Sequence, residues 1–263
     1  MVTVNDIRTA LFAAAPAYMK MEWDNVGLMC GEPEHPVTRV LVALDASPEA
    51  LDEAAAHGCE LLVCHHPMIF GGTKSVTSET PTGRALLYAI RRDIAVISMH
   101  TNLDCAPDGV NDVLARTLGL SNVRVLNPAG QDAQGRDYGL IRVGTVEQTT
   151  LRDFAAHVKS ALSCAGLRYA DAGRAVCQVA VGGGACGGAM DEVLAVGCDT
   201  FVTADLKYHE FADAPALGLN LIDAGHFQTE NPVCGYLCAL LEEKFADVEV
   251  ILSKTHADRI HFL

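Results

Sequence analysis

The sequence predicts an α/β protein with mostly parallel or mixed sheets that helices cover on both faces. Short apolar runs of strand length alternate with segments of helical periodicity along most of the 263 residues. Half of the residues are hydrophobic and 20% are charged, which excludes a disordered chain and is enough to form a full core.

The expected elements fall into two groups, because a polar, turn-rich stretch at 127–137 interrupts the alternation. We therefore expect two α/β lobes, 1–127 and 128–263. Asn231 and Pro232 are typical of an N-cap and a first helical position, so a helix should start there and run to about Phe245. The other expected helices are 48–57, 83–92, 110–118, 150–163 and 189–196, and the expected strands are 40–44, 60–64, 94–98, 138–146, 176–181, 200–204 and 219–223.

The charge balance limits the partners. Lys and Arg total 19 against 33 Asp and Glu, so the formal net charge is −14. Such a chain lacks the basic side chains that displace counterions from phosphates, and we expect no nucleic-acid partner. No apolar run approaches the roughly 18 residues of a membrane span, so we expect a soluble protein with no membrane partner.

The ten cysteines indicate a reducing compartment. No pair has the C-x-x-C spacing of zinc ribbons or thioredoxin-like sites. The apolar stretch 11–17 is short, and no basic region precedes it as in a signal peptide. Thr3 and Asp6 instead have the spacing of a helix capping box. We expect a cytoplasmic protein with reduced cysteines.

Two groups of histidines and acids follow predicted strands of the first lobe, where α/β sheets build their sites. His65 and His66 come directly after strand 60–64. Neighbours on a strand point to opposite sides, so these two histidines could bind two different ions, or they could simply form a polar turn. His100 and Asp104 follow strand 94–98 and could face one cavity, unless Asp104 only caps the next helix.

Further candidates follow the strands of the second lobe. Glu230 lies one helical turn after His226 if the segment is helical, and Gly225 permits a tight turn before them. Imidazole and carboxylate together suit Zn, Fe, Mn, Co or Ni. After strand 200–204, Lys207 and His209 could contact an anionic substrate or move a proton, or they could be solvated loop residues.

Two other segments allow more than one interpretation. Trp23, the only tryptophan, lies in a segment with Asp24 that could be either a buried aromatic anchor or part of a site. The stretch 182–187 matches G-x-G-x-x-G between a strand and a helix, as in dinucleotide sites. Glycine-rich turns are also common as purely structural devices, which we favour here.

Five short motifs occur together along nearly the whole chain. Their order and separations resemble those of the NIF-three-like family, whose members are also called GTP cyclohydrolase I type 2 homologs. The motifs are WDNVGLMCG at 23–31, CHHP at 64–67, HTNLD at 100–104, DLKYHE at 205–210 and DAGHFQTE at 223–230.

The resemblance implies two intertwined three-layer α/β lobes with a dinuclear metal site between them, and a toroidal homohexamer. It implies two divalent metal ions, with Glu230 bridging them and His100 nearby. The implied ligands are His65, His66, Asp104, His226 and Glu230.

Such a centre predicts a metal-dependent hydrolase that uses metal-bound hydroxide on an unidentified small-molecule substrate. His209 and Lys207 are then the candidate catalytic side chains beside the metals. The alternative is a non-catalytic protein that binds or carries metal ions, or regulates a partner.

Overall fold

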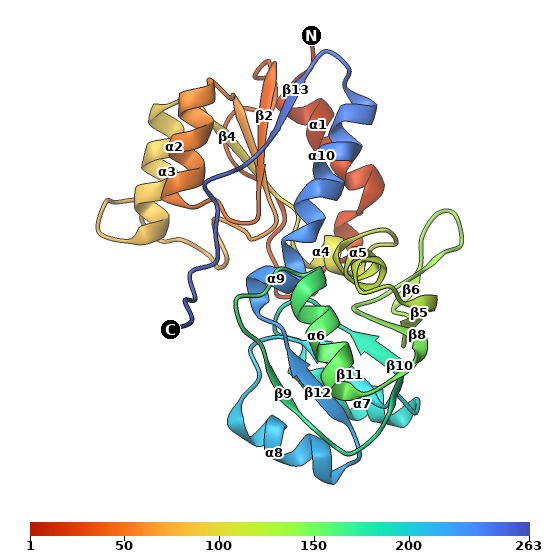
Figure 1. Ribbon diagram of the computed structural model, residues 1–263. Helices are drawn as coiled ribbons and strands as arrows, with labels where there is room; N and C mark the ends of the chain where they lie inside the picture. The colour runs from red at the N-terminus through yellow and green to blue at the C-terminus, as the bar shows by residue number, and fades with distance from the viewer. The chain divides into compact units, whose positions relative to one another are not determined.

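A computed structural model describes residues 1–263 (Figure 1). The chain folds into two compact units, each built from two separate stretches of sequence. The first unit is 1–106 with 234–257, and the second is 107–233 with 258–263. The expected lobes 1–127 and 128–263 remain a prediction about the organisation of the chain, whereas these two units interleave along it.

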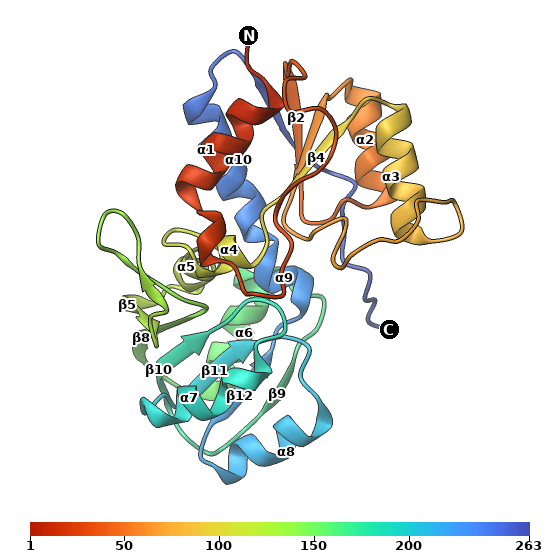
Figure 2. The same cartoon turned by 180° about the vertical axis from the view of Figure 1, so that it is seen from behind.

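The first unit is built on a five-stranded sheet in the order β1-β4-β3-β2-β13, in which only the pairing of β1 with β4 is antiparallel. Helices α2 and α3 cover one face, and α1 and α10 cover the other (Figures 1 and 2). The strands are β1 Gly27–Cys30, β2 Arg39–Ala43, β3 Leu61–Cys64, β4 Ala95–Ser98 and β13 Glu249–Leu252. The helices are α1 Val4–Ala14, α2 Pro48–His57, α3 Pro81–Arg91, α4 Thr101–Cys105, the 3₁₀ turn Ala17–Met19, and α10 Pro232–Lys244, of which all but the first two residues belong to this unit.

Alternating side chains of the first sheet enter different cores. Leu41 and Leu62 join the cluster under α2 and α3, whereas their neighbours Val40 and Leu61 are fully buried on the opposite face. Both faces are therefore apolar, and this explains why the strands appear in the sequence as continuous apolar runs.

The second unit has a six-stranded mixed sheet in the order β5-β8-β10-β11-β12-β9, of which β10, β11 and β12 are parallel. Helices α5 and α6 pack on one face, and α7 and α8 on the other (Figures 1 and 2). The strands are β5 Ser121–Leu126, β8 Ile141–Thr149, β9 Arg168–Ala170, β10 Val176–Val181, β11 Thr200–Thr203, β12 Asn220–Asp223 and the hairpin pair β6 Gly130–Gln131 and β7 Asp137–Tyr138. The helices are α5 Val110–Thr117, α6 Leu151–Ala161, α7 Met190–Ala195, α8 Tyr208–Ala216, α9 His226–Glu230 and the 3₁₀ turn Gly187–Ala189.

The mixed α/β class is confirmed, and so is the capping box of Thr3 and Asp6. The predicted N-cap at Asn231 is wrong, because Asn231 has helical dihedral angles and directly follows α9. None of the helices is long and apolar enough to cross a bilayer. All ten cysteines are free thiols.

Candidate metal centre

In the first unit, the candidate residues lie at one edge of the sheet. Strands β2, β3 and β4 are parallel, so their carboxyl ends share that edge. Asp45 follows β2, His65 and His66 follow β3, and His100 follows β4.

His65 and His66 leave the alternation of the strand because the chain turns where β3 ends. The N–H groups of both residues donate to the carbonyl oxygen of Leu44, at 3.1 and 2.9 Å. Their ring centroids are consequently only 5.0 Å apart, so the two imidazoles lie together. His65 is fully buried and His66 is partly exposed.

His100 completes a cluster of three imidazoles within the first unit. Its ring centroid lies 5.2 Å from that of His65 and 5.7 Å from that of His66. One potential ligand atom from each ring lies within 4.8 Å of the others, a spacing that a single metal ion can span. His100 therefore joins the two histidines that the sequence put forward as ligands.

Each of these three histidines has an acceptor oxygen at Nδ1. The partners are the carbonyl of Met99 for His65 at 2.7 Å, Oδ1 of Asp45 for His66 at 2.7 Å, and Oδ1 of Asp24 for His100 at 2.8 Å. Carbonyl and carboxylate oxygens only accept hydrogen bonds, so Nδ1 carries the hydrogen and the lone pair of each neutral ring is on Nε2. Metal-binding histidines in proteins have this arrangement, because the second nitrogen fixes the tautomer and the orientation of the ring.

Asp24, the acceptor for His100, is buried and also accepts hydrogen bonds from Thr101. Burial acts to raise its pKa, but hydrogen bonds from His100 and Thr101 outweigh burial and hold the pKa well below its usual range. The interpretation of the neighbouring Trp23 as a buried anchor is wrong, because Trp23 is 61% exposed. The buried member of this segment is the carboxylate.

Asp104 lies on the short helix α4, and its carboxylate is buried. Its Oδ1 is 3.5 Å from Nε2 of His65. It does not cap the next helix, because Gly109 is the N-cap residue of α5. Asp104 thus places a candidate oxygen ligand beside the histidine cluster.

In the second unit, His226 and Glu230 lie one turn apart on α9, and Nε2 of His226 is 3.0 Å from Oε2 of Glu230. Nδ1 of His226 donates to Oδ2 of Asp205 at 2.7 Å. Gly225, before the helix, has a φ of +91°, and a Cβ there would lie 2.2 Å from the side chain of Gln228. The tight turn expected at this glycine is confirmed.

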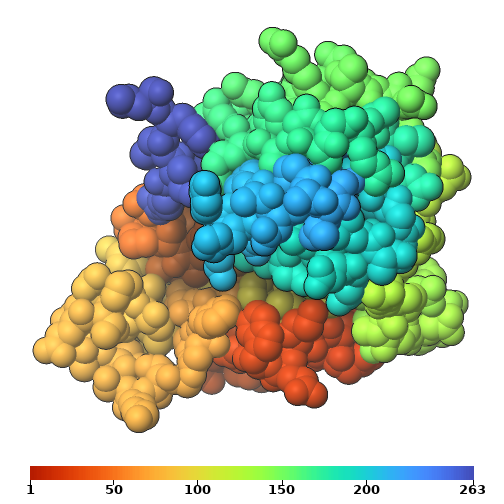
Figure 3. Space-filling view, turned by 90° about the horizontal axis from the view of Figure 1, so that it is seen from below, coloured from red at the N-terminus to blue at the C-terminus, as the bar shows by residue number.

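Asp205 was missed as the partner of His226, although it opens the DLKYHE motif. It follows β11 and has a φ of +55°, a conformation that non-glycine residues rarely adopt and that often marks functional sites. Lys207 and His209 lie further along, at the N-cap and on the exposed surface of α8, light blue in Figure 3. Their catalytic roles remain predictions.

The N–H groups of the glycine-rich stretch are hydrogen-bonded within the second unit. The N–H of Gly183 donates to Asn111, that of Gly184 to Thr229, and that of Cys186 to Thr203. These groups are therefore engaged within the protein, whereas a dinucleotide loop keeps them for a pyrophosphate.

Gly184 leaves space for the side chain of Glu230. Its φ is +64°, and a Cβ at this position would lie 2.2 Å from Oε1 of Glu230. The loop can approach the carboxylate only because a side chain is absent.

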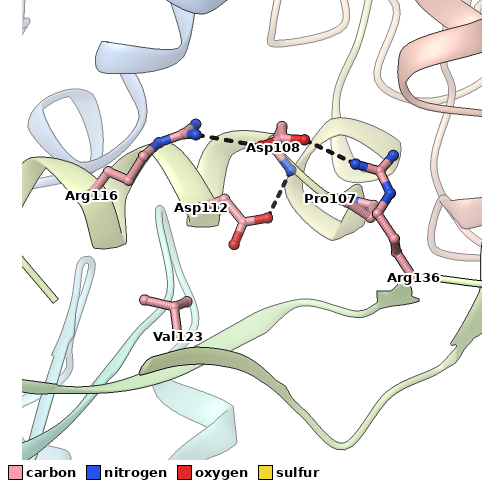
Figure 4. Close-up of a pocket in the computed structure, with 6 residues that line it drawn as sticks. All are labelled: Pro107, Asp108, Asp112, Arg116, Val123 and Arg136. Atoms are coloured by element: carbon pink, nitrogen blue, oxygen red, sulfur yellow. Dashed lines mark hydrogen bonds and ion pairs between the residues drawn. The ribbon is translucent and has the colours of Figure 1, made fainter. Parts of the chain in front are cut away.

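A separate surface pocket of about 240 Å³ lies near α5 in the second unit (Figure 4). Arg116 and Arg136 line it, and both pair with Asp108, at 3.4 and 3.0 Å. Arg136 also pairs with Asp132 at 2.8 Å, and Asp112 lines the pocket as well. Because carboxylates balance the charge of both arginines, the pocket is not a strong anion site.

The donor set fits a divalent metal ion. Nε2 of His226, as the lone-pair nitrogen of a neutral ring, and the nearby Glu230 oxygen both present lone pairs, so a cation between them satisfies both. Imidazole nitrogens and carboxylate oxygens suit Zn, Fe, Mn, Co or Ni. The first unit therefore contains three histidines that could hold a metal ion, and the second contributes a histidine and a glutamate as candidate ligands.

The fold and these clusters define a two-unit α/β protein with candidate metal ligands at sheet edges. The chain belongs to the Duf34/NIF3 (NGG1p interacting factor 3) family, whose model matches residues 2–259. A Streptomyces coelicolor protein named GTP cyclohydrolase 1 type 2 homolog is 41% identical over 267 residues, covering 98% of this chain and 93% of that protein.

Solved structures of related proteins have the same fold. A Bacillus cereus protein related to NIF3 has a TM-score of 0.93 at 27% identity, covering 100% of this chain and 99% of that one. A Staphylococcus aureus protein has a TM-score of 0.92 at 30% identity, with the same coverage.

Proposed function

We propose that this protein is a metal-dependent hydrolase with a dinuclear centre of divalent ions. The observation that carries the proposal is the shared chemistry of the three histidines among the proposed ligands, each of which has an acceptor oxygen at Nδ1 and so presents Nε2 for coordination. The proposed ligands are His65, His66, Asp104, His226 and Glu230.

Two bound ions would lower the pKa of a shared water and stabilise negative charge on a substrate oxygen. The protein's own residues have supporting roles. His65 and His66 would anchor separate ions, and the two carboxylate oxygens of Glu230 would allow it to bridge them. Lys207 would contact an anionic substrate group, and His209 would move a proton.

The substrate is a small molecule. Relatives carry the name GTP cyclohydrolase 1 type 2 homolog, and a nucleotide such as GTP is therefore the first substrate to test. We place the protein in the cytoplasm, since ten free thiols are stable in a reducing compartment.

Metal analysis is the first test of the proposal. Protein loaded with Mn, Zn, Fe or Co should retain about two ions per chain, and His66→Ala and Glu230→Gln should each retain fewer. His157→Ala, which removes an exposed histidine of α6, is the matched control and should bind metal as the wild type does. Equal metal content in all four proteins would refute the ligand assignment.

An activity panel tests the hydrolase itself. The loaded protein should hydrolyse at least one member of a panel of phosphoesters, nucleotides and amides, and Glu230→Gln should lose that activity. Release of formate from GTP, absent in His66→Ala, would identify a cyclohydrolase. Full metal occupancy without any turnover would contradict the hydrolase proposal and favour a metal-carrying or regulatory protein.

A further inference from the structure

Two large aromatic side chains next to the histidine cluster are exposed. Trp23 is 61% exposed and Phe70 is 60% exposed, although both belong to the well-packed first unit. Exposed aromatic side chains that lie next to each other, beside candidate ligands, more often mark a binding surface than a packing defect.

The two rings form a small, continuous platform. Their centroids are 5.6 Å apart with an angle of 41° between the ring planes. A flat ligand ring inserted between them would need about 7 Å, because each stacked contact takes about 3.5 Å. A ligand ring must therefore lie on the outer face of the pair.

The platform is next to His100. The imidazole centroid lies 6.1 Å from the ring of Trp23 and 6.0 Å from that of Phe70, and both contacts are edge-on. A ring stacked on the platform would be held one side chain away from the proposed metal ligands.

The platform is also held in place. Asp24, which follows Trp23, is buried and accepts hydrogen bonds from His100 and Thr101. Nδ2 of Asn25 donates to the carbonyl oxygen of Ile69 at 2.7 Å, which ties the segment of Trp23 to that of Phe70. If Trp23 served only to hold His100 in place, burial of its ring would stabilise the protein more than the observed exposure does.

We propose that Trp23 and Phe70 bind a flat heteroaromatic ring of the substrate, such as a purine base, by stacking. This inference deepens the proposed function and rests on it. Neither ring can transfer a proton, so both are positioning residues that bring the substrate to the metal centre. Aromatic side chains bind bases through their faces with little regard to sequence or substituent, so the platform selects for a ring rather than for a particular base.

The only tryptophan of the chain provides a direct measurement. Metal-loaded protein is titrated with guanosine and, separately, with ribose 5-phosphate. Guanosine should quench the fluorescence of Trp23, and ribose 5-phosphate should not. Isothermal titration calorimetry should show guanosine binding at least tenfold weaker in Trp23→Ala and in Phe70→Ala, with Trp23→Phe between these variants and the wild type.

Tyr169→Ala, which removes an exposed aromatic side chain of β9, is the matched control and should bind guanosine normally. If the panel reveals a nucleotide substrate, Trp23→Ala should raise its KM with little change in kcat. Metal content measured in parallel separates the two proposals, because protein that binds guanosine without retaining metal contradicts the proposed function alone.

Three outcomes would refute the proposed stacking role of Trp23 and Phe70. Guanosine could leave Trp23 fluorescence unchanged and bind Trp23→Ala as tightly as the wild type. Trp23→Ala and Phe70→Ala could instead change the oligomeric state in light scattering with guanosine binding intact, which would make the pair a contact between copies of the chain. Loss of metal in both Trp23→Ala and Trp23→Phe would show that the ring only steadies His100.

Discussion

The first unit presents its candidate ligands after β3 and β4, at the carboxyl edge of four adjacent parallel strands. The second presents its own after β12, at the carboxyl edge of three. In the first unit, histidines come directly after the strands, and acidic side chains from neighbouring segments orient them. In the second unit, the ligands lie on the short helix α9, and a glycine loop packs against one of them.

The difference shows two ways to hold a ligand still. A histidine at a strand end needs a hydrogen-bond partner for its second nitrogen, which a carboxylate supplies. A glutamate on a helix next to a loop needs space, which only a missing side chain supplies. We therefore expect the first unit to be sensitive to loss of a buried carboxylate and the second to the addition of a methyl group.

The largest effect is expected for Gly184→Ala. The new Cβ would lie 2.2 Å from Oε1 of Glu230 at a residue with a φ of +64°. We expect the free energy of unfolding to fall by about 2–4 kcal/mol in urea denaturation, with lower metal content. Gly188→Ala in the same loop has open space, and should change stability by less than about 0.5 kcal/mol. Equal effects of the two substitutions would contradict the expectation that contact with Glu230 makes position 184 sensitive.

A smaller effect should distinguish two histidine partners, Asp24 and Asp205. Asp24→Asn leaves a buried site without its charged acceptor and should cost about 2 kcal/mol of unfolding free energy. Asp205→Asn changes a side chain that is 48% exposed and should cost less than about 1 kcal/mol. Thermal and urea unfolding of the two variants measure the difference, and a greater loss in Asp205→Asn would contradict it.

A pH effect is expected from Glu53 in the first unit. Burial works against ionisation of Glu53, but hydrogen bonds from Ser253, Lys254 and Thr255 outweigh it and lower the pKa from 4.5 to about 2. Because the folded pKa is the lower one, the stabilisation is fully present above about pH 4.5 and is lost as the pH falls towards 2.

Glu53→Gln should therefore be less stable than the wild type by about 1 kcal/mol at pH 7. The two proteins should converge in urea denaturation between pH 4.5 and the acid limit of folding. A difference that stays constant over this range would mean that the Glu53 carboxylate is not the group responsible.

The smallest effect is expected for Arg116→Ala, in the pocket of Figure 4. The pair of Arg116 with Asp108 is about half exposed on both sides, and such pairs contribute little. We expect a change below about 0.5 kcal/mol in unfolding free energy and no change in metal content. Reduced metal content would extend the ligand-bearing region of the second unit to this pocket.

The sequence predicted much of the fold because the buried strands are apolar on both faces. Strand 176–181 has its expected bounds, and the other expected strands overlap with β2, β3, β4, β8, β11 and β12. The four edge strands β1, β5, β9 and β13 were missed, since each is partly exposed and lacks the continuous buried apolar run of the central strands. Their pairing is decided by partners far along the chain.

Positions after predicted strands marked the ligand residues as candidates, and the motif resemblance implied the ligand set, but their hydrogen-bond partners were not predicted. Asp24 is 76 residues from His100, and only tertiary structure brings the two together. The G-x-G-x-x-G match at 182–187 likewise shows what a sequence pattern leaves undecided. Its pattern cannot tell whether the N–H groups of the loop face a ligand or are already bonded within the protein, as they are here.

Strand β13 has a consequence for synthesis. It pairs with β2, and the side chain of Arg39 donates to that of Glu249 across 210 positions. Because β2 is synthesised long before β13, this sheet can only be completed after the whole intervening stretch has been translated. Premature termination shortly before that point would leave β2 with an open edge, and such truncated chains should be prone to aggregation and degradation.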